Sequence, residues 1–239
     1  MIKKAVYLVS KLYYDAVIPS VKSLLMNSGV DEVYLLTEGA KYPNQLPENV
    51  KVINAQKLKK EFLDPKGANI KKSKYTYLPL LRCAYSKIFP DDSRILSLDA
   101  DTIVVDDMGS ELWTMDMCGN YVAGVIEQRL SRKKRTNYIN AGVMVFDLDK
   151  IREDKKDDEM IEAVNTTDYY WLEQDCINEK CAGRIKVIPR IYNASQFTGI
   201  SKKTLLRHFA YEQNWTEYDV VKHYAGIPWE EVMKVWGNK

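Results

Sequence analysis

Several features are scarce in this sequence, and each scarcity excludes a class of protein. The 239 residues hold 35 lysines and arginines against 33 aspartates and glutamates, a net charge of +2. That balance argues against a nucleic-acid-binding protein, whose affinity rests on neutralising phosphates. The four cysteines form no Cys-x-x-Cys pair, so neither a zinc ribbon nor a redox motif is indicated. No apolar run approaches the roughly 20 residues that a membrane-spanning helix needs.

The sequence also shows neither a clear signal peptide nor a linker between domains. The N-terminus resembles the start of a signal peptide, but the apolar run at residues 5–9 is too short for its hydrophobic part. We therefore expect a cytoplasmic protein, and we interpret three Asn-x-Ser/Thr matches, at Asn165, Asn193 and Asn214, as chance. No repeat, low-complexity segment or Gly/Ser-rich linker interrupts the chain, so we expect a single domain over residues 1–239.

Apolar runs alternate with helical patterns in the first part of the chain. Residues 5–9, 33–36 and 50–53 are typical of buried strands, and a helical pattern separates the first two. This rhythm predicts an α/β fold with a mixed, mainly parallel sheet flanked by helices. We expect residues 1–105 to form a nucleotide-binding half and residues 106–239 an acceptor-facing half.

Three later segments carry further expectations. Residues 75–89 predict one long helix that ends at Pro90, and residues 219–222 predict a strand. Residues 229–236 predict an amphipathic helix with its tryptophans on one face. That helix either docks on the core or contacts a membrane surface, so a place at the inner face of a membrane stays open.

The strongest chemical signal is a pair of carboxylates after an apolar run. Residues 94–98 (RILSL) lead into Asp99, Ala100 and Asp101. In an extended chain, residues i and i+2 point to the same side, roughly 6–7 Å apart, so the two carboxylates can hold one divalent cation. Small Ala100 leaves the opposite side uncrowded. They would lie at the carboxyl end of a strand, where open α/β sheets bind their ligands.

Five motifs follow one another in an order that resembles the family 8 retaining glycosyltransferases, the family of glycogenin and bacterial lipopolysaccharide galactosyltransferases. They are Tyr75…Arg82…Ile88-Phe89-Pro90, RILSLDADTIVV at residues 94–105, YINAGVMV at residues 138–145, EQD at residues 173–175 and HYAG at residues 223–226. The resemblance covers nearly the whole chain. It implies a GT-A fold, a nucleotide-sugar donor, usually a UDP-sugar, and Mn²⁺ or another divalent cation.

The resemblance also implies roles for single residues. Asp99, Asp101 and His223 would bind the metal, and the catalytic group would be Glu173, Gln174 and Asp175. Within that group, Gln174 would lie beneath the anomeric carbon. The donor-binding residues would be Tyr13, which stacks on the base, Arg82, Asp99, Ala100, Asn140, Ala141, Gly142 and Gly226. Asn140 would touch the donor sugar, for which Ala141 and Gly142 leave room.

The chemistry that follows is transfer of a hexose to a hydroxyl group of a glycan, a lipid-linked acceptor or a protein, in bacterial-type glycan or lipopolysaccharide synthesis. An amide is a poor nucleophile, so we expect no covalent glycosyl-enzyme at Gln174. The leaving phosphate would instead help to deprotonate the acceptor on the same face. Positioning then matters more than a strong base.

The sequence departs from the family at three positions. Lys11 stands after the first strand, where the family has an acid that reads the uracil N–H, and a lysine cannot accept that hydrogen bond. Ile227-Pro228-Trp229 follows HYAG without the lysine that meets the diphosphate. Glu173 replaces the family's usual aspartate.

Two other functions compete with this interpretation. The first is a haloacid dehalogenase-type phosphatase, with Asp99 as nucleophile and Asp101 as acid/base, although its motif normally follows the first strand. The second is a catalytically degenerate binding protein on the same fold. A nucleotidyltransferase is a weaker third, because no Gly/Arg-rich loop follows the first strand.

Overall fold

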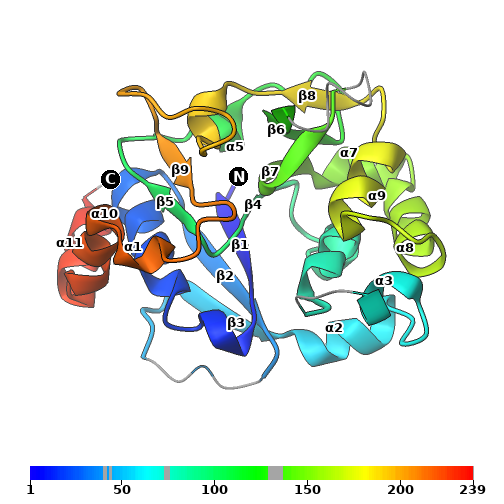
Figure 1. The fold of residues 1–239 in the computed structure, drawn as a ribbon, viewed down its shortest axis with the longest axis horizontal. Helices are drawn as coiled ribbons and strands as arrows, with labels where there is room; N and C mark the ends of the chain where they lie inside the picture. Colours follow the sequence, from blue (N-terminus) through cyan, green and yellow to red (C-terminus); the bar gives the residue numbers. More distant parts are fainter. Residues whose placement is uncertain (40–41, 43–44, 73–75, 129–136, 239) are drawn as a thin grey trace.

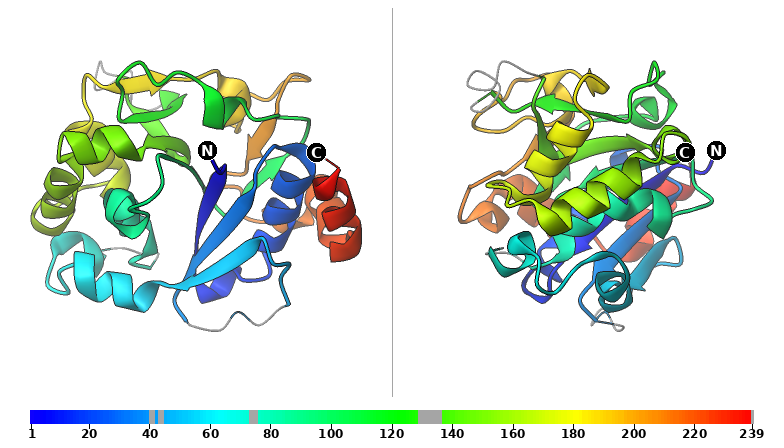
Figure 2. Two further views of the ribbon diagram at one scale, coloured as in Figure 1. Left: turned by 180° about the vertical axis from the view of Figure 1, so that it is seen from behind. Right: turned by 90° about the vertical axis from the view of Figure 1, so that its right-hand side faces the viewer.

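The protein is described here from a computed structural model covering residues 1–39, 42, 45–72, 76–128 and 137–238 (Figure 1). Seven strands form one sheet in the order β3-β2-β1-β4-β7-β6-β8, and β5 pairs with β9 in a small second sheet. Helices lie on both sides of the main sheet, as Figure 2 shows from two further directions. The predicted α/β architecture is confirmed.

The strands of the main sheet are β1 (Lys4–Val9), β2 (Glu32–Thr37), β3 (Val50–Asn54), β4 (Arg94–Leu98), β6 (Val122–Ile126), β7 (Ile139–Asp147) and β8 (Ile185–Val187). The second sheet consists of β5 (Thr102–Val104) and β9 (Leu206–His208). The α-helices are α1 (Val17–Asn27), α2 (Ala55–Phe62), α3 (Ala68–Lys72), α4 (Tyr85–Ile88), α5 (Glu111–Thr114), α7 (Leu148–Glu153), α8 (Lys156–Thr166), α9 (Leu172–Lys180), α10 (Asp219–Gly226) and α11 (Trp229–Gly237). The 3₁₀ helices are η1 (Lys11–Tyr13), η2 (Leu78–Ala84), η3 (Arg190–Tyr192) and η4 (Trp215–Glu217).

The strand order places a ligand-binding edge beside β1 and β4. Strands β3, β2, β1 and β4 are mutually parallel, whereas β7 runs antiparallel to both β4 and β6. From β1 the chain passes to β2 on one side and later returns with β4 on the other side. In open α/β sheets the carboxyl ends of two such strands form the crevice where ligands bind.

Alternation along the strands builds two apolar cores, one on each face of the sheet. In β1, Ala5, Tyr7 and Val9 belong to the core that includes side chains of α1, α10 and α11. Val6 belongs to the opposite core, with side chains of α8 and α9. Successive side chains of a strand point to opposite faces, so a strand covered on both sides is apolar throughout.

Two predicted elements differ from the structure. The helix expected over residues 75–89 is split into η2 and α4, because Ala84 between them leaves the helical conformation with a ψ of 11°; Tyr75 lies outside the described residues. The strand expected over residues 219–222 is the first part of α10. Val221 and Tyr224, three residues apart, are both buried, and this helical spacing overrides the β preference of the valines.

The C-terminal amphipathic helix was predicted correctly as an element. Its Trp236 ring N–H donates to the carbonyl oxygen of Val30 at 2.8 Å, and the Trp229 ring faces the ammonium group of Lys22. The helix therefore uses both tryptophans in docking against the α1 side of the sheet. No helix among the described residues combines the length and apolarity needed to cross a bilayer.

Candidate active site

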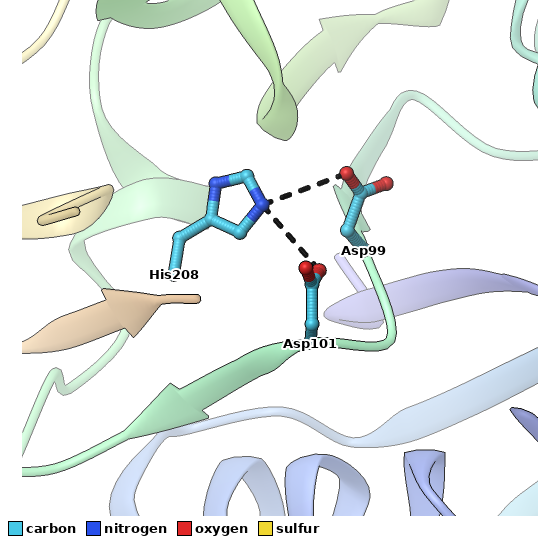
Figure 3. A group of neighbouring side chains, drawn as sticks. All are labelled: Asp99, Asp101 and His208. Atoms are coloured by element: carbon cyan, nitrogen blue, oxygen red, sulfur yellow. Dashed lines mark ion pairs between the residues drawn. The ribbon is translucent and has the colours of Figure 1, made fainter. Parts of the chain in front are cut away.

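Two carboxylates and one imidazole converge beyond the carboxyl end of β4 (Figure 3). Asp99 and Asp101 lie in the connection between β4 and β5, and His208 ends β9, where it pairs with Thr102 of β5. Nε2 of His208 lies 3.4 Å from Oδ1 of Asp101 and 3.7 Å from Oδ2 of Asp99. One ligand atom from each residue falls within 4.8 Å of the other two. Two carboxylates and an imidazole suit a borderline cation such as Mn²⁺, so this donor set fits the expected metal.

The third member of this cluster corrects a prediction. We expected His223, but that residue is exposed on α10, where its ring packs edge-on against Tyr224. Gly226, expected to bind the donor, ends the same helix, and α10 packs against α1 (Figure 1). The prediction failed because it relied on a glycine three residues after the histidine. Leu206 and His208 are buried in β9 and Arg207 between them is only partly buried, but this alternation becomes visible only in the structure.

The His208 ring packs so close to the backbone at residue 142 that only glycine fits there. A Cβ atom built on Gly142 would lie 2.1 Å from Cε1 and 2.5 Å from Nδ1 of His208. A side chain at this position would therefore displace the ring. We had predicted that Gly142 leaves room for the donor sugar, whereas the structure fills that space with the His208 ring.

Arg82 joins the carboxylate pair to α9. Its Nη1 donates to Oε1 of Glu173 at 2.8 Å, its Nη2 to Asp99, and its Nε to the Ser97 hydroxyl at 3.1 Å. The side chain is only 2% exposed. Burial alone would lower the pKa of the guanidinium, but Asp99 and Glu173 raise it, so Arg82 stays charged. Burial is the main reason that the pKa of Glu173 is raised, and Arg82 opposes it.

Gln174 is held at both ends of its amide. Its Oε1 accepts a hydrogen bond from the backbone N–H of Ala141 at 2.8 Å, and its Nε2 donates to the Tyr138 hydroxyl at 3.2 Å. That hydroxyl donates in turn to Oδ1 of Asp175 at 2.8 Å, while Oδ2 of Asp175 accepts from the N–H of Trp171 at 2.7 Å. The structure thus brings Gln174 beside Ala141, and Asp175 fixes the Tyr138 hydroxyl that Gln174 contacts.

No role was predicted from the sequence for three buried polar residues, Glu127, Asn193 and His208, which are linked through Asn140. Asn140 donates from Nδ2 to the Glu127 carboxylate at 3.1 Å and accepts from Nδ2 of Asn193 at 3.0 Å. Asn193 also contacts Nδ1 of His208 at 2.8 Å. Asn193 is 1% exposed, Glu127 3% and His208 4%. We had noted Asn193 only as a chance Asn-x-Ser match, because no local pattern shows that a single asparagine is buried.

His208 and Asp101 shift each other's pKa. Burial favours the neutral forms of His208 and Asp101, but their attraction for one another outweighs it. The pKa of His208 is therefore raised and that of Asp101 is lowered.

The end of β1 carries the expected base-binding segment. Tyr13 lies in η1 and is 39% exposed, and Leu12 beside it is 91% exposed. The backbone N–H of Lys11 donates to Oε2 of Glu38 at 3.2 Å. The Glu38 carboxylate, from the residue that follows β2, therefore lies next to this turn.

Ala100, also expected at the donor site, lies between Asp99 and Asp101 and packs partly buried against the apolar core.

Comparison with solved structures identifies the fold class as GT-A. A WbbM bifunctional glycosyltransferase superposes with a TM-score of 0.74 at 16% identity, over 99% of this chain and 51% of that chain. The galactosyltransferase LgtC, solved with donor and acceptor sugar analogs, gives 0.70 at 17%, over 98% and 95%. GlyE of Streptococcus pneumoniae TIGR4 gives 0.69 at 17%, over 99% and 63%. The chain thus spans about half of WbbM but nearly all of LgtC.

The sequence itself matches the model of glycosyl transferase family 8 over residues 4–237. The chain belongs to this family and is a glycosyltransferase, as the motifs predicted. The family match decides against a phosphatase that uses Asp99 and Asp101. No curated protein sequence matches the chain.

Proposed function

We propose that the protein is a metal-dependent retaining glycosyltransferase that moves a hexose from a UDP-sugar to a hydroxyl of a glycan acceptor, in bacterial-type glycan synthesis. The observation that carries this proposal is the convergence of Asp99, Asp101 and His208 at the carboxyl end of β4. These three residues would hold Mn²⁺ or another divalent cation. A cation bound there would supply Lewis-acid stabilisation of the negative charge that develops on the diphosphate.

The position of Gln174 bears on the route by which the configuration would be retained. Its Oε1 is engaged by the Ala141 N–H, and an amide is a weak nucleophile, so we assign it no covalent bond to the sugar. The acceptor oxygen instead attacks the anomeric carbon on the face from which the phosphate leaves. The bond from that carbon to the phosphate oxygen breaks, and the acceptor proton passes to the departing phosphate. Glu173 and Arg82 would orient the sugar hydroxyls.

Glu38 can replace the acid that the family has at the position of Lys11. The family's base-reading acid is missing from the segment after β1, but the Glu38 carboxylate lies within hydrogen-bonding distance of the Lys11 backbone. Its remaining oxygen lone pairs can accept the uracil N–H. We therefore keep uracil as the base, with Tyr13 as its stacking partner. Binding of UDP but not of GDP or ADP by the wild-type protein, lost in Glu38→Leu, supports this assignment, and equal binding of all three contradicts it.

An aromatic cluster supports a glycan as acceptor. Trp171 packs edge-on against Tyr170 and Tyr211, and Tyr211 also packs against Phe197. Tyr170 is 75% exposed and Tyr211 55%. Trp171 precedes α9, and Tyr211 follows His208 by three residues, so the cluster stands next to both parts of the site. Rigid aromatic rings offer contact area to a sugar ring at little entropic cost.

The acceptor assignment is tested by Tyr211→Ala. We expect a raised KM for a saccharide acceptor and an unchanged KM for the donor. The control is Tyr218→Ala, which removes a similarly exposed tyrosine that packs on Phe209 outside the cluster. An unchanged acceptor KM in Tyr211→Ala would remove the cluster from the acceptor site.

The function itself is tested by transfer from a panel of UDP-hexoses in the presence of Mn²⁺, with the anomeric configuration of the product read by NMR. We expect an α-linked product from an α-linked donor, and loss of transfer in Asp101→Asn and His208→Gln but not in His223→Gln. Inversion, or a glycosylated enzyme peptide on the reaction path, contradicts the mechanism. Tight UDP-sugar binding without transfer or hydrolysis would instead identify a degenerate binding protein.

A further inference from the structure

The hydrogen bond made by Nδ1 of His208 decides whether Nε2, which faces Asp99 and Asp101, carries a proton or a free lone pair. Nδ1 lies 2.8 Å from Oδ1 of Asn193, and both side chains are buried. A distance between heavy atoms does not say where the hydrogen lies, and the two ends of an asparagine amide look alike. The assignment therefore needs a donor whose identity is certain.

The backbone N–H of Gly142 is that donor. It lies 2.9 Å from Oδ1 of Asn140, and since a backbone N–H only donates, the facing atom of Asn140 is its oxygen. An atom of Asn193 lies 3.0 Å from the same oxygen and must be the amide nitrogen. The other end of Asn193, which faces His208, is then its oxygen, which only accepts. The hydrogen of this last contact belongs to Nδ1 of His208.

We propose that Asn193, oriented through Asn140 by the Gly142 N–H, is a positioning residue that holds neutral His208 with its proton on Nδ1. Nε2 then keeps its lone pair, aimed at the space shared with Asp99 and Asp101. This inference rests on the metal-binding part of the proposed function. It assigns to Asn193 the preparation of the imidazole as a ligand, before any cation arrives.

The opposing tautomer is disfavoured by the same distances. A proton on Nε2 would face carboxylate oxygens at 3.4 and 3.7 Å, beyond the usual 2.9–3.0 Å of an N–H···O bond. It would also leave Nδ1 and Oδ1 of Asn193 as two acceptors 2.8 Å apart. Two facing acceptors without a hydrogen between them, away from water, cost the desolvation of both.

The first test is NMR of the imidazole nitrogens in the wild-type, metal-free protein. The chain has only two histidines, so His223→Gln identifies both sets of signals without touching the site. At the alkaline end of a pH titration, where both rings are neutral, we expect a proton on Nδ1 of His208. Exposed His223 serves as the internal reference. A proton on Nε2 of His208 would overturn the proposal.

The second test is Mn²⁺ binding, followed by electron paramagnetic resonance of the free ion. Asn193→Leu removes the acceptor at nearly constant volume, and we expect the affinity to fall roughly 10–100-fold. Asn193→Asp keeps an acceptor toward Nδ1 but loses the donor to Asn140, so we expect it to recover only part of the affinity. Thermal unfolding of each variant checks that the fold is retained.

The outcomes separate the positioning role from the metal site. If the wild type binds Mn²⁺ and Asn193→Leu binds it less than about tenfold more weakly, the positioning role is wrong while the metal site stands. If the wild type itself does not bind Mn²⁺, the proposed metal site is wrong, and the NMR measurement alone decides the tautomer. The NMR measurement likewise decides if Asn193→Leu does not fold.

Discussion

Two regions of this molecule are held together by different forces. In β1 and β2 the buried side chains are almost all apolar, and Leu24 and Leu25 of α1 pack in the same core. Near the carboxyl end of β4 and the amino-terminal part of β7, the buried side chains include charged and amide groups. Those groups are Arg82, Glu127, Glu173, Asn193 and His208.

The difference lies in what each side chain needs from its neighbours. An apolar side chain gains by leaving water wherever it packs well, so its surroundings can vary. A buried polar side chain needs one partner of the right kind, and those partners come from afar. Arg82 and Glu173, for example, are 91 residues apart in the sequence. The first region should therefore tolerate change at a cost in stability alone, whereas the second should lose function as well.

The largest expected effect follows from removing Arg82. In Arg82→Met, Glu173 loses its cation in a buried place, and we expect the free energy of unfolding to fall by about 3–5 kcal/mol in urea titrations. Transfer should be lost. The double variant Arg82→Met/Glu173→Leu should regain stability but not transfer. A double variant that regains transfer would show that the ion pair only supports the fold.

The apolar region supplies the matched comparison. Leu24→Ala opens a cavity beneath α1, and we expect unfolding to become easier by about 2–5 kcal/mol. The affinity for Mn²⁺ should stay the same at temperatures where the variant is folded, because the Leu24 side chain packs in the apolar core and takes no part in the hydrogen bonds of the site. A changed affinity would mean that the two regions are coupled, and the contrast drawn above would not hold.

A pair of glycines sharpens the comparison within the site. Gly142→Ala forces the His208 ring to move, with an expected loss of about 1–3 kcal/mol in stability and weaker Mn²⁺ binding by calorimetry. Gly226→Ala is the control, because a Cβ atom there meets nothing within 4 Å. Since Gly226 ends α10, its replacement should leave Mn²⁺ binding unchanged and stabilise the protein by at most about 1 kcal/mol. The reverse pattern would return the metal site to residues 223–226.

The smallest expected effect is on the pH dependence of stability and concerns Glu32, in β2 at the edge of the apolar region. A hydrogen bond from Lys51, with further help from Tyr34 and Lys4, lowers the pKa of Glu32 below its ordinary value of 4.5. A lowered folded-state pKa stabilises the protein above the unfolded-state pKa, and this contribution disappears as the pH falls through the folded-state value.

We therefore expect Glu32→Gln to cost about 0.2–1 kcal/mol at neutral pH, as for a surface ion pair. The variant should lose less stability than the wild type when the pH is lowered below about 4.5. Urea titrations at a series of pH values measure both effects. Parallel pH profiles for the two proteins would mean that Glu32 gains nothing from Lys51.

The same contrast explains how far the sequence could be interpreted. The strands β1, β2 and β4 and the helix α11 were predicted because apolar runs and helical spacing are local properties. Asp99 and Asp101 lie just beyond the end of β4, where we expected them, because they directly follow such a strand. His208 and Asn193 were missed because their roles depend on pairing between β5 and β9 and on one backbone N–H of Gly142. Neither the pairing nor that N–H leaves a pattern in the sequence.

The most direct test of the central claim is anomalous diffraction at the manganese absorption edge, from crystals grown with Mn²⁺ and UDP. We predict a single strong peak between Asp99, Asp101 and Nε2 of His208, with Nδ1 still against Asn193 and His223 far from the ion. A peak at His223, or three side chains that point to different places with no ion between them, would contradict the account.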